Sequence, residues 1–398
     1  MDTPGLIGDR IRELRHHRGM PLKTLAGLAG LSVGFLSMVE NGKRIIDRRA
    51  HLVAVAEALH VSVPELVGQP LAPVDPVHSA ALATVPAIRA ALVALSFTPD
   101  EPPGRTLGEL TAESVRLAPL RAACDYVSLG CALPNLMADL HSAASQNDGQ
   151  RRGDALRMLV ETTYHCTYTL KYLGFADLAM RAADHCHAAG QRLGDPAWLA
   201  VAEFTRLHSL PPDSGPRIAR LASEAADQLE PHTADPGAQQ VYGMLHLTAA
   251  LTAAIAGRAD EVSAHLGEAE RVAGQTGEGS FAHMSFGPTN VGFWRVAIAV
   301  ELGEGGKAPA IARDLHPELV RSASRQAAFY ADLGRALAQT RRHDSEAVRS
   351  LARAERLAPQ RIRTSSAVRE TVADILRRSR RDAGGRELRG LARRCAIA

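Results

Sequence analysis

The side chains best suited to ligand binding lie in three segments, where they recur at helical spacing. Tyr164, His165, Tyr168 and Tyr172 fall in the first segment, Tyr242 and His246 in the second, and Asn290, Trp294 and Arg295 in the third. Residues three or four apart share one face of a helix, so each segment would present a polar aromatic face. Such faces are typical of pockets for peptides or small molecules. The candidate effector groove comprises Tyr164, Tyr168, Tyr242, His246, Asn290, Trp294 and Arg295. The alternative is that these rings are core residues with satisfied polar atoms.

Other chemistry is not indicated. The segments His165-Cys166 and His185-Cys186-His187 offer metal-binding atoms, but adjacent side chains on a helix point apart. The five cysteines show no CxxC spacing, which excludes zinc-ribbon and redox motifs and favours a reducing cytoplasm. Glycine-rich phosphate loops, GxSxG and HExxH motifs are absent from the sequence. We therefore expect no metal, no cofactor and no enzymatic activity.

The N-terminal segment shows the sequence pattern of five short helices. Gly19 is placed to end a first helix, and a second short helix follows it. Ser32 is a good N-cap for a third helix that runs to about Asn41. A fourth helix is expected over about 48–59, and Pro64 suits the first turn of a fifth.

This segment resembles the phage-repressor (XRE-type) helix-turn-helix family over residues 6–67. The similarity lies in RELR at 12–15, glycine at 19, LAGLAGLS at 25–32, FLSMVENGKR at 35–44 and AEALHVSVPELV at 56–67. The resemblance implies that the third helix enters the major groove of double-stranded DNA.

The resemblance also implies roles for individual residues. Those facing base edges would be Val33, Gly34, Ser37 and Met38, and those meeting phosphates would be Lys23, Asn41, Lys43 and Arg44. Arg15 and Glu40 match a structural ion pair of the family. One departure is Leu22, where the family usually has a glutamine that contacts phosphate. Because the base-facing residues lack strong hydrogen-bonding side chains, we expect readout biased to A·T pairs through thymine methyl groups, with steep salt dependence.

Beyond the N-terminal segment, helical patterns break at regular intervals. The breaks fall near Gly174, 213–215, Gly257, Gly303 and 342–344. Such a period is typical of a helical repeat array somewhat longer than the tetratricopeptide (TPR) unit, and a non-repetitive bundle is the alternative. No stretch alternates with period two, so we expect no sheet.

From about residue 77 the chain resembles the helical-repeat sensor domain of a group of actinobacterial helix-turn-helix regulators. The similarity lies in FGPTNVGFWRVAIAVELG at 286–303, LPNLMADL at 133–140, GMLHLTAALTAA at 243–254 and AERLAP at 354–359. The segment SRQAAFYADLGRAL at 324–337 departs from the group, which usually has a more charged, histidine-containing stretch there. Ligand chemistry shared with the group is therefore in doubt at this segment.

Composition and charge fit an all-α chain. Apolar residues make up 46% of the sequence and aromatic residues only 4%, which argues against a sandwich or barrel. We predict a five-helix DNA-binding domain at 1–68, a proline-rich linker at 69–76 and a TPR-like α-solenoid for sensing and dimerisation at 77–398. The arginine-rich stretch 349–394 is interpreted as a solvated cap of the solenoid, with a DNA-binding arm as the alternative.

The sequence also bears on localisation. The N-terminus lacks the apolar region of a signal peptide, and we expect no apolar run of the length that a membrane span needs. These features favour a cytoplasmic protein with no membrane partner.

Two functions remain open from the sequence. The first is a homodimeric transcriptional regulator that binds an inverted-repeat operator and whose solenoid binds a peptide or small-molecule effector. The second is a DNA-localised hub whose repeats dock another protein. Loss of operator binding on adding a ligand to the purified protein would favour the first, and a copurifying partner would favour the second.

Overall fold

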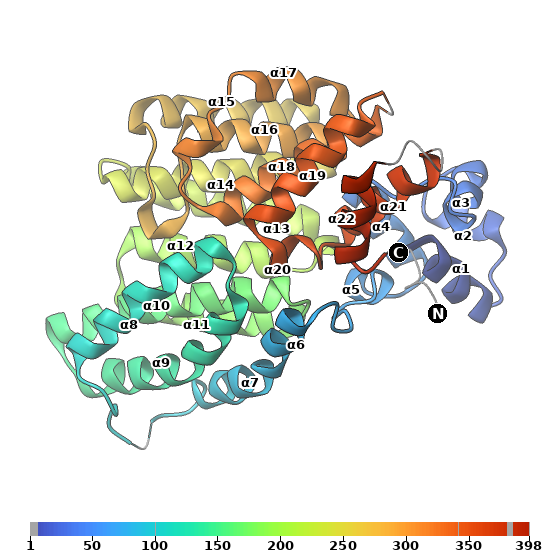
Figure 1. The fold of residues 1–398 in the computed structure, drawn as a ribbon. Coiled ribbons are helices and arrows are strands. Elements are labelled where there is room, and N and C mark those ends of the chain that lie inside the picture. The colour runs from blue at the N-terminus through green and yellow to red at the C-terminus, as the bar shows by residue number, and fades with distance from the viewer. Residues whose placement is uncertain (1–6, 100, 341, 380–384, 398) are drawn as a thin grey trace.

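The computed structural model describes residues 7–99, 101–340, 342–379 and 385–397, and helices form almost all of its regular structure (Figure 1). Within these ranges no strand forms, and the only β-type pairing there is one isolated antiparallel bridge between Gly279 and Phe286. The all-α expectation is confirmed: a helix-turn-helix domain precedes a solenoid-like helical body.

The N-terminal domain packs five helices around a small core. They are α1 (Ile7–His17), α2 (Leu22–Leu28), α3 (Val33–Glu40), α4 (Arg49–Ala58) and α5 (Val63–Leu66). Ile11, Leu25 and Leu36 are fully buried and join α1, α2 and α3. Gly8 is required where α1 crosses α3, because a Cβ there would collide with the backbone oxygen of Val39.

Local signals define the third helix as expected. The Ser32 hydroxyl accepts a hydrogen bond from the Phe35 amide at 3.1 Å, which caps α3. Gly30 adopts a φ of +63° in the preceding turn, a left-handed conformation that favours glycine. Asn41 forms the C-cap, so α3 begins and ends where the sequence indicates.

The body contains the remaining helices. In its first half these are α6 (Pro76–Ala83), α7 (Val85–Ala94), α8 (Leu107–Ala123), α9 (Tyr126–Gln146), α10 (Gly149–Tyr172), α11 (Ala176–Leu193), α12 (Pro196–Ser209) and α13 (Gly215–Leu229). In its second half they are α14 (Pro236–Ile255), α15 (Ala259–Thr276), α16 (Pro288–Leu302), α17 (Ala308–Arg313), α18 (Ala323–Gln339), α19 (Asp344–Leu357), α20 (Pro359–Ile362), α21 (Ser366–Arg378) and α22 (Arg386–Arg394). Short 3₁₀ turns lie at 212–214, 230–232, 281–283, 305–307 and 317–319.

The breaks expected from the sequence are turns between consecutive helices. Gly174 separates α10 from α11, Gly257 separates α14 from α15, and Gly303 follows α16. The segment 213–215 lies between α12 and α13, and 342–344 lies between α18 and α19. Gly174, Gly257 and Gly303 have positive φ values of 72–90°, so a left-handed residue ends the helix at these three turns.

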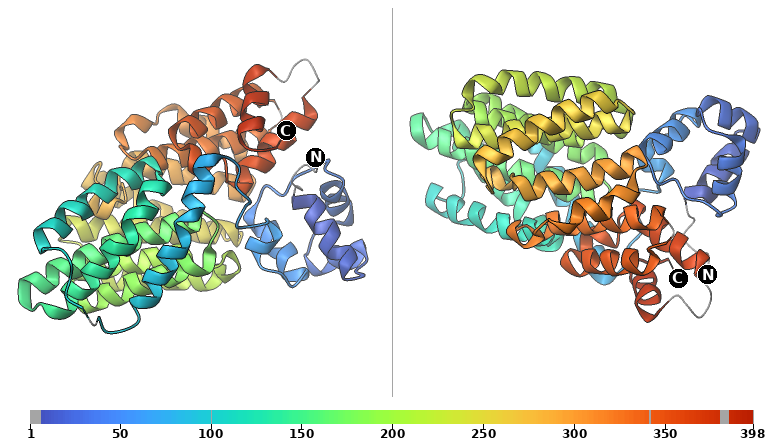
Figure 2. Two further views of the ribbon diagram at one scale, coloured as in Figure 1. Left: turned by 60° about the horizontal axis from the view of Figure 1, so that its bottom comes forward. Right: turned by 90° about the horizontal axis from the view of Figure 1, so that it is seen from above.

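The body curves until helices from its early and late parts meet. Helix α8 contacts both α10 and α18, although more than 200 residues separate α8 from α18. The backbone amide of Tyr126 also donates to the Gln360 side chain at 3.1 Å. The views in Figure 2 show the helix-turn-helix domain at one end of this body, beside the C-terminal helices. The curvature therefore encloses an interior lined by residues from distant parts of the chain.

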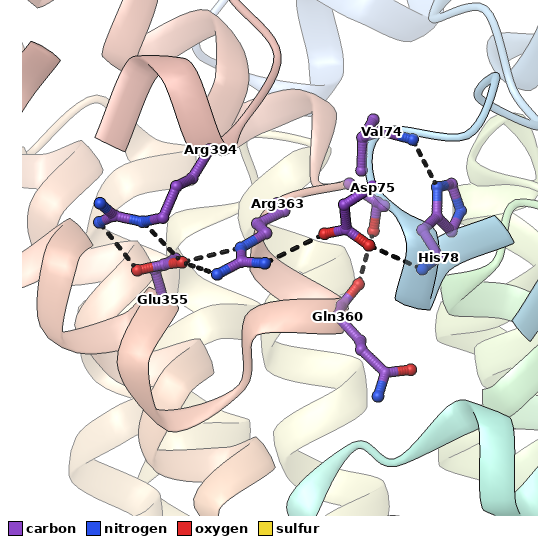
Figure 3. Close-up of polar contacts among 8 residues, drawn as sticks. Val74, Asp75, His78, Glu355, Gln360, Arg363 and Arg394 are labelled. Atoms are coloured by element: carbon purple, nitrogen blue, oxygen red, sulfur yellow. Dashed lines mark hydrogen bonds and ion pairs between the residues drawn. The ribbon is translucent and has the colours of Figure 1, made fainter. Parts of the chain in front are cut away.

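A network of charged side chains joins the linker to the C-terminal helices (Figure 3). Arg363 bridges the Asp75 and Glu355 carboxylates at 3.0 and 2.6 Å, and Arg394 binds the other oxygen of Glu355 at 3.0 Å. Asp75 also caps α6 by accepting from the His78 amide. Burial alone would raise the pKa of Glu355, but Arg394 and Arg363 lower it. We call these four residues, Asp75, Glu355, Arg363 and Arg394, the paired network.

The N-terminal domain docks on the body through polar contacts. The Glu301 carboxylate accepts from the backbone amide of Arg49 at 2.8 Å, and its carbonyl accepts from Arg48 at 2.9 Å. Glu370 in α21 accepts from the amide of Ile7, the first residue of α1, at 2.8 Å. Thus α16 and α21 of the body hold the starts of α4 and α1 in the N-terminal domain.

One pair of helices is longer and more apolar than the sequence analysis anticipated. Pro76–Ala94, which covers α6 and α7, has the length and a mean hydropathy of 1.5 that a membrane span would need. The expectation that the chain has no apolar run of this length was therefore wrong, as judged by length and composition. Its apolar residues Ala81, Ile88 and Leu92 are fully buried in the body core, where both helices contact α9. Helix α9 of the same body therefore covers one side of this stretch, and 28% of it is buried.

Candidate functional site

A buried ion pair fixes the third helix of the N-terminal domain. Arg15 donates from Nε and Nη2 to the two carboxylate oxygens of Glu40, both at 2.7 Å, and from Nη1 to the Met20 carbonyl at 2.9 Å. Both side chains are buried, and the hydrogen bond to Glu40 raises the pKa of Arg15. A bidentate pair of this geometry orients α1 relative to the end of α3.

The outward face of α3 exposes two large apolar side chains. Val33 is 44% exposed and Met38 is 38% exposed, which is unusual for apolar residues of a small domain. Gly34 is exposed as well, and a Cβ added there would meet no atom within 4 Å. Ser37 is half-buried beside them. The four proposed base-facing residues thus share one accessible surface.

The proposed phosphate-contacting residues flank this surface. Lys23, Asn41, Lys43 and Arg44 are all exposed. The Asn41 side chain donates to the Ser37 carbonyl at 2.7 Å, and the Arg44 guanidinium lies 5.1 Å from the centre of the Phe35 ring. Among the described residues no carboxylate pairs with Lys23, Lys43 or Arg44, so their charge is available to a phosphate backbone.

The structure divides the candidate effector groove among three places. Tyr164, Tyr168, Asn290 and Trp294 lie together in the enclosed interior of the body. Asn290 is fully buried: its amide donates to the Ser285 carbonyl, and its oxygen accepts from Arg325 at 2.7 Å. The tyrosines stack edge to face, with ring centres 4.9 Å apart.

Tyr242 and His246 lie outside that interior. Met244 of the same helix reaches Asn290, and a residue two positions away points to the opposite side of a helix. His246 instead approaches His265 of α15, with their Nδ1 atoms 3.0 Å apart. Burial, and then His265, lower the pKa of His246 to about 4.

Arg295 lies in the third place, on the outer surface. Its guanidinium approaches Glu270 of α15 at 3.5 Å. It lines an open groove of about 560 Å³ together with Pro288, Ile311 and Leu315. The seven predicted residues therefore do not form one continuous groove.

Three buried arginines lie beside the interior tyrosines, Asn290 and Trp294, and the sequence analysis missed them. They are Arg121 of α8, Arg325 of α18 and Arg361 of α20. Arg121 lies over the Tyr168 ring at 4.8 Å, and Arg361 lies over the Tyr172 ring at 4.3 Å. Arg325 falls in the segment that departs from the resembled group, which was the single available signal. We call the three arginines with Tyr126, Tyr164, Tyr168, Tyr172, Asn290 and Trp294 the interior cluster.

Comparison with known proteins identifies the N-terminal part alone. Residues 6–67 match a protein family described as a helix-turn-helix domain. No curated protein and no solved structure matches the chain. The match covers the surface built around α3, so a DNA-binding domain is supported at the N-terminus, while the role of the body must be argued from its geometry.

Proposed function

We propose that this protein is a sequence-specific transcriptional regulator that binds double-stranded DNA through α3 and responds to an effector bound by its helical body. The observation that carries the first part is the accessible surface of α3 within the matched family region. Val33 and Met38 are exposed there, next to cations that have no carboxylate partner among the described residues. Such a surface fits the major groove and its flanking phosphates.

The same surface supports a particular mode of reading DNA. Val33 and Met38 gain from contact with thymine methyl groups, and Gly34 lets the helix approach the bases closely. One module of this kind covers few base pairs, so we propose that two copies bind an inverted repeat with half-sites about one helical turn apart. This function would place the protein in the cytoplasm, at the nucleoid.

The effector role rests on the way the body is joined to the DNA-binding domain. Helix α16 carries Asn290 and Trp294 in the interior and Glu301 at the contact with Arg48 and Arg49. A ligand that shifts α16 would therefore shift α4. The enclosed position of the interior cluster favours a small ligand over a docked protein as effector.

Selection of random DNA by the purified full-length protein tests the proposal. We expect enrichment of an A·T-rich inverted repeat, and footprinting should protect two half-sites. Replacement of thymine by uracil at contacted positions should weaken binding because it removes only the methyl group. Failure to enrich any sequence, or protection of a single half-site at saturating protein, would contradict the DNA-binding or the dimer part respectively.

A further inference from the structure

The three arginines of the interior cluster come within reach of one another at Ser324. Arg361 donates from Nη1 to both the hydroxyl and the carbonyl of Ser324, each at 2.7 Å, and Arg121 donates to the same hydroxyl at 3.2 Å. The next residue, Arg325, turns to the Asn290 oxygen. A fourth cation, Lys171, lies nearby and donates to the His208 carbonyl. Four positive charges thus converge where the ends of the body meet.

Their partners are all neutral. Arg121 and Arg361 have Ser324 and tyrosine rings, and Arg325 has the Asn290 amide and the Trp294 ring at 5.5 Å. In the part of the chain that the structure describes, no aspartate or glutamate forms an ion pair with any of the three. Burying cations together without an anion is costly, because each loses hydration and repels the others.

Several other buried or half-buried arginines have a carboxylate partner. Arg15 has Glu40, Arg335 has Asp332 at 2.9 Å, and Arg363 has Asp75 and Glu355. The half-buried Arg369 donates to the Cys395 carbonyl and has no carboxylate partner among the described residues, so a single unpaired arginine is tolerated. The interior cluster differs because three such arginines lie together, and a missing anion explains this grouping.

The field of the cluster is strong enough to act on its neighbours. Burial alone would raise the pKa of Tyr172, but Arg361, Arg121 and Lys171 together lower it. Burial, and then Arg361, lower the pKa of Arg325 to about 10. Burial and the neighbouring positive charge thus both disfavour the charged form of Arg325, whereas, against the effect of burial, the surrounding tyrosines raise the pKa values of Arg121 and Arg361.

Unused hydrogen-bonding groups point to a ligand independently of charge. The Tyr126 hydroxyl, the Trp294 Nε1 and the Arg121 Nε are buried and have no partner. Tyr126 is fully buried and Trp294 nearly so, and leaving such donors unpaired is unfavourable. The three arginines, Tyr172 and His208 nevertheless keep partial solvent exposure.

We propose that the interior cluster is the effector site and that the effector is a small organic anion, whose carboxylate or phosphate group is bound by Arg121, Arg325 and Arg361. Planar guanidinium groups bind both kinds of oxyanion in a bidentate manner. Tyr172 and Trp294 supply aromatic surface for the rest of the molecule, and the unpaired donors of Tyr126 and Trp294 supply hydrogen bonds. This inference rests on the proposed effector function and names its ligand class.

Thermal unfolding of the full-length protein at constant ionic strength tests the site, with pyrophosphate and citrate as the phosphate and carboxylate probes. Variants Arg325→Gln and Arg361→Gln remove one charge each, Arg361→Lys keeps the charge, and Arg349→Gln is the control at an exposed arginine of α19. We expect a rise of about 5 °C in the wild-type melting temperature at an anion concentration ~100 times the dissociation constant. The rise should be retained in Arg349→Gln, reduced in Arg361→Lys and lost in both glutamine variants.

The anion-free melting temperatures complete the test. Neutralising one repelling charge should leave the temperature of Arg325→Gln equal to or above that of the wild type. The inference is overturned if neither probe stabilises the wild type more than the glutamine variants, or if those variants unfold at clearly lower temperature without anion, which would make the arginines structural. DNA binding is read separately by fluorescence anisotropy on the selected repeat. An anion shift without any change in DNA affinity would retain the site and reject the effector function.

Discussion

The paired network and the interior cluster are both arginine-rich, both lie at the junction between the start and end of the body, and they differ in one respect. In the paired network every arginine has a carboxylate at 2.6–3.0 Å. In the interior cluster Arg121, Arg325 and Arg361 have only neutral partners. The comparison teaches that the two regions do not differ in arginine content, and that the balance of buried charge is what separates the structural joint from the proposed binding site.

The largest expected effect comes from breaking a pair. Glu40→Ala should destabilise the N-terminal domain by roughly 3–5 kcal/mol, because it leaves the Arg15 charge buried and unpaired. Hydrogen exchange in the full-length protein would show this as faster exchange across 7–67 with little change in the body. Unchanged protection of α1 and α3 would mean that the pair adds nothing to the fold.

The next effect is a difference in sign between the two regions. Glu355→Gln should lower the free energy of unfolding by about 2 kcal/mol, because Arg394 loses its carboxylate partner and Arg363 keeps only that of Asp75, while both arginines keep some access to water. Arg325→Gln should raise it by about 1 kcal/mol, since it removes a charge that its surroundings oppose. Urea denaturation of both variants provides the measurement. A loss of stability in both would erase the distinction between the regions.

Acidification should act on the two regions at different pH. Burial, together with nearby cations and histidines, holds the pKa of His165 and His208 well below their ordinary value of 6.5. The unfolded chain therefore takes up protons that the folded chain refuses, and stability falls as the pH drops below about 6.5, by up to ~1.4 kcal/mol per pH unit for each histidine that stays neutral.

In the paired network the titrating groups are carboxylates, and they lose their stabilising charge at a lower pH. Against the effect of burial, the His78 backbone amide and then Arg363 lower the pKa of Asp75, and Arg394 and Arg363 lower that of Glu355, so their stabilisation persists until the pH falls below the ordinary carboxylate range. Melting temperatures measured between pH 7.5 and 4 should begin to fall at a higher pH in the wild type than in His165→Gln, and the total fall should be smaller in the variant. Equal decline in both proteins between pH 6.5 and 5 would show that His165 does not drive the loss.

The smallest effect on folding concerns an unpaired cation at the surface. Lys43 is exposed, so Lys43→Ala should change the free energy of unfolding by less than about 0.5 kcal/mol. It should weaken binding to all DNA sequences about equally and reduce the slope of log affinity against log salt by about one. Loss of sequence preference with an unchanged salt slope would instead assign Lys43 to base reading.

Local chemistry explains what the sequence could reveal. Ser32 caps α3 by accepting a hydrogen bond from the amide of Phe35, three residues later, and Gly30 turns the chain through its positive φ. Both features can therefore be predicted from short segments of sequence. The side of α16 that faces the interior was not readable in this way. That helix is buried around most of its circumference, so hydrophobic periodicity does not separate Trp294 from Arg295.

The interior cluster could not be predicted from the sequence for a second reason. Arg121 and Arg361 meet at Ser324 only because the body curves until α8 contacts α18 and α20 follows behind it. That curvature is the sum of small rotations between successive helices, and no single residue encodes it. Tyr164, Tyr168, Asn290 and Trp294 were found because they share helical spacing, which is a local property.

The hydrogen bond from Ile7 to Glu370 has a consequence for the order in which the protein is made. Its two partners are 363 residues apart, so at about 5–20 residues per second roughly 20–70 s of translation separate them. During that interval the first helix of the N-terminal domain is complete while its carboxylate partner does not yet exist. Arg361 and Glu355 also emerge late. A nascent chain therefore displays its DNA-binding helices well before it possesses the body that would restrain them.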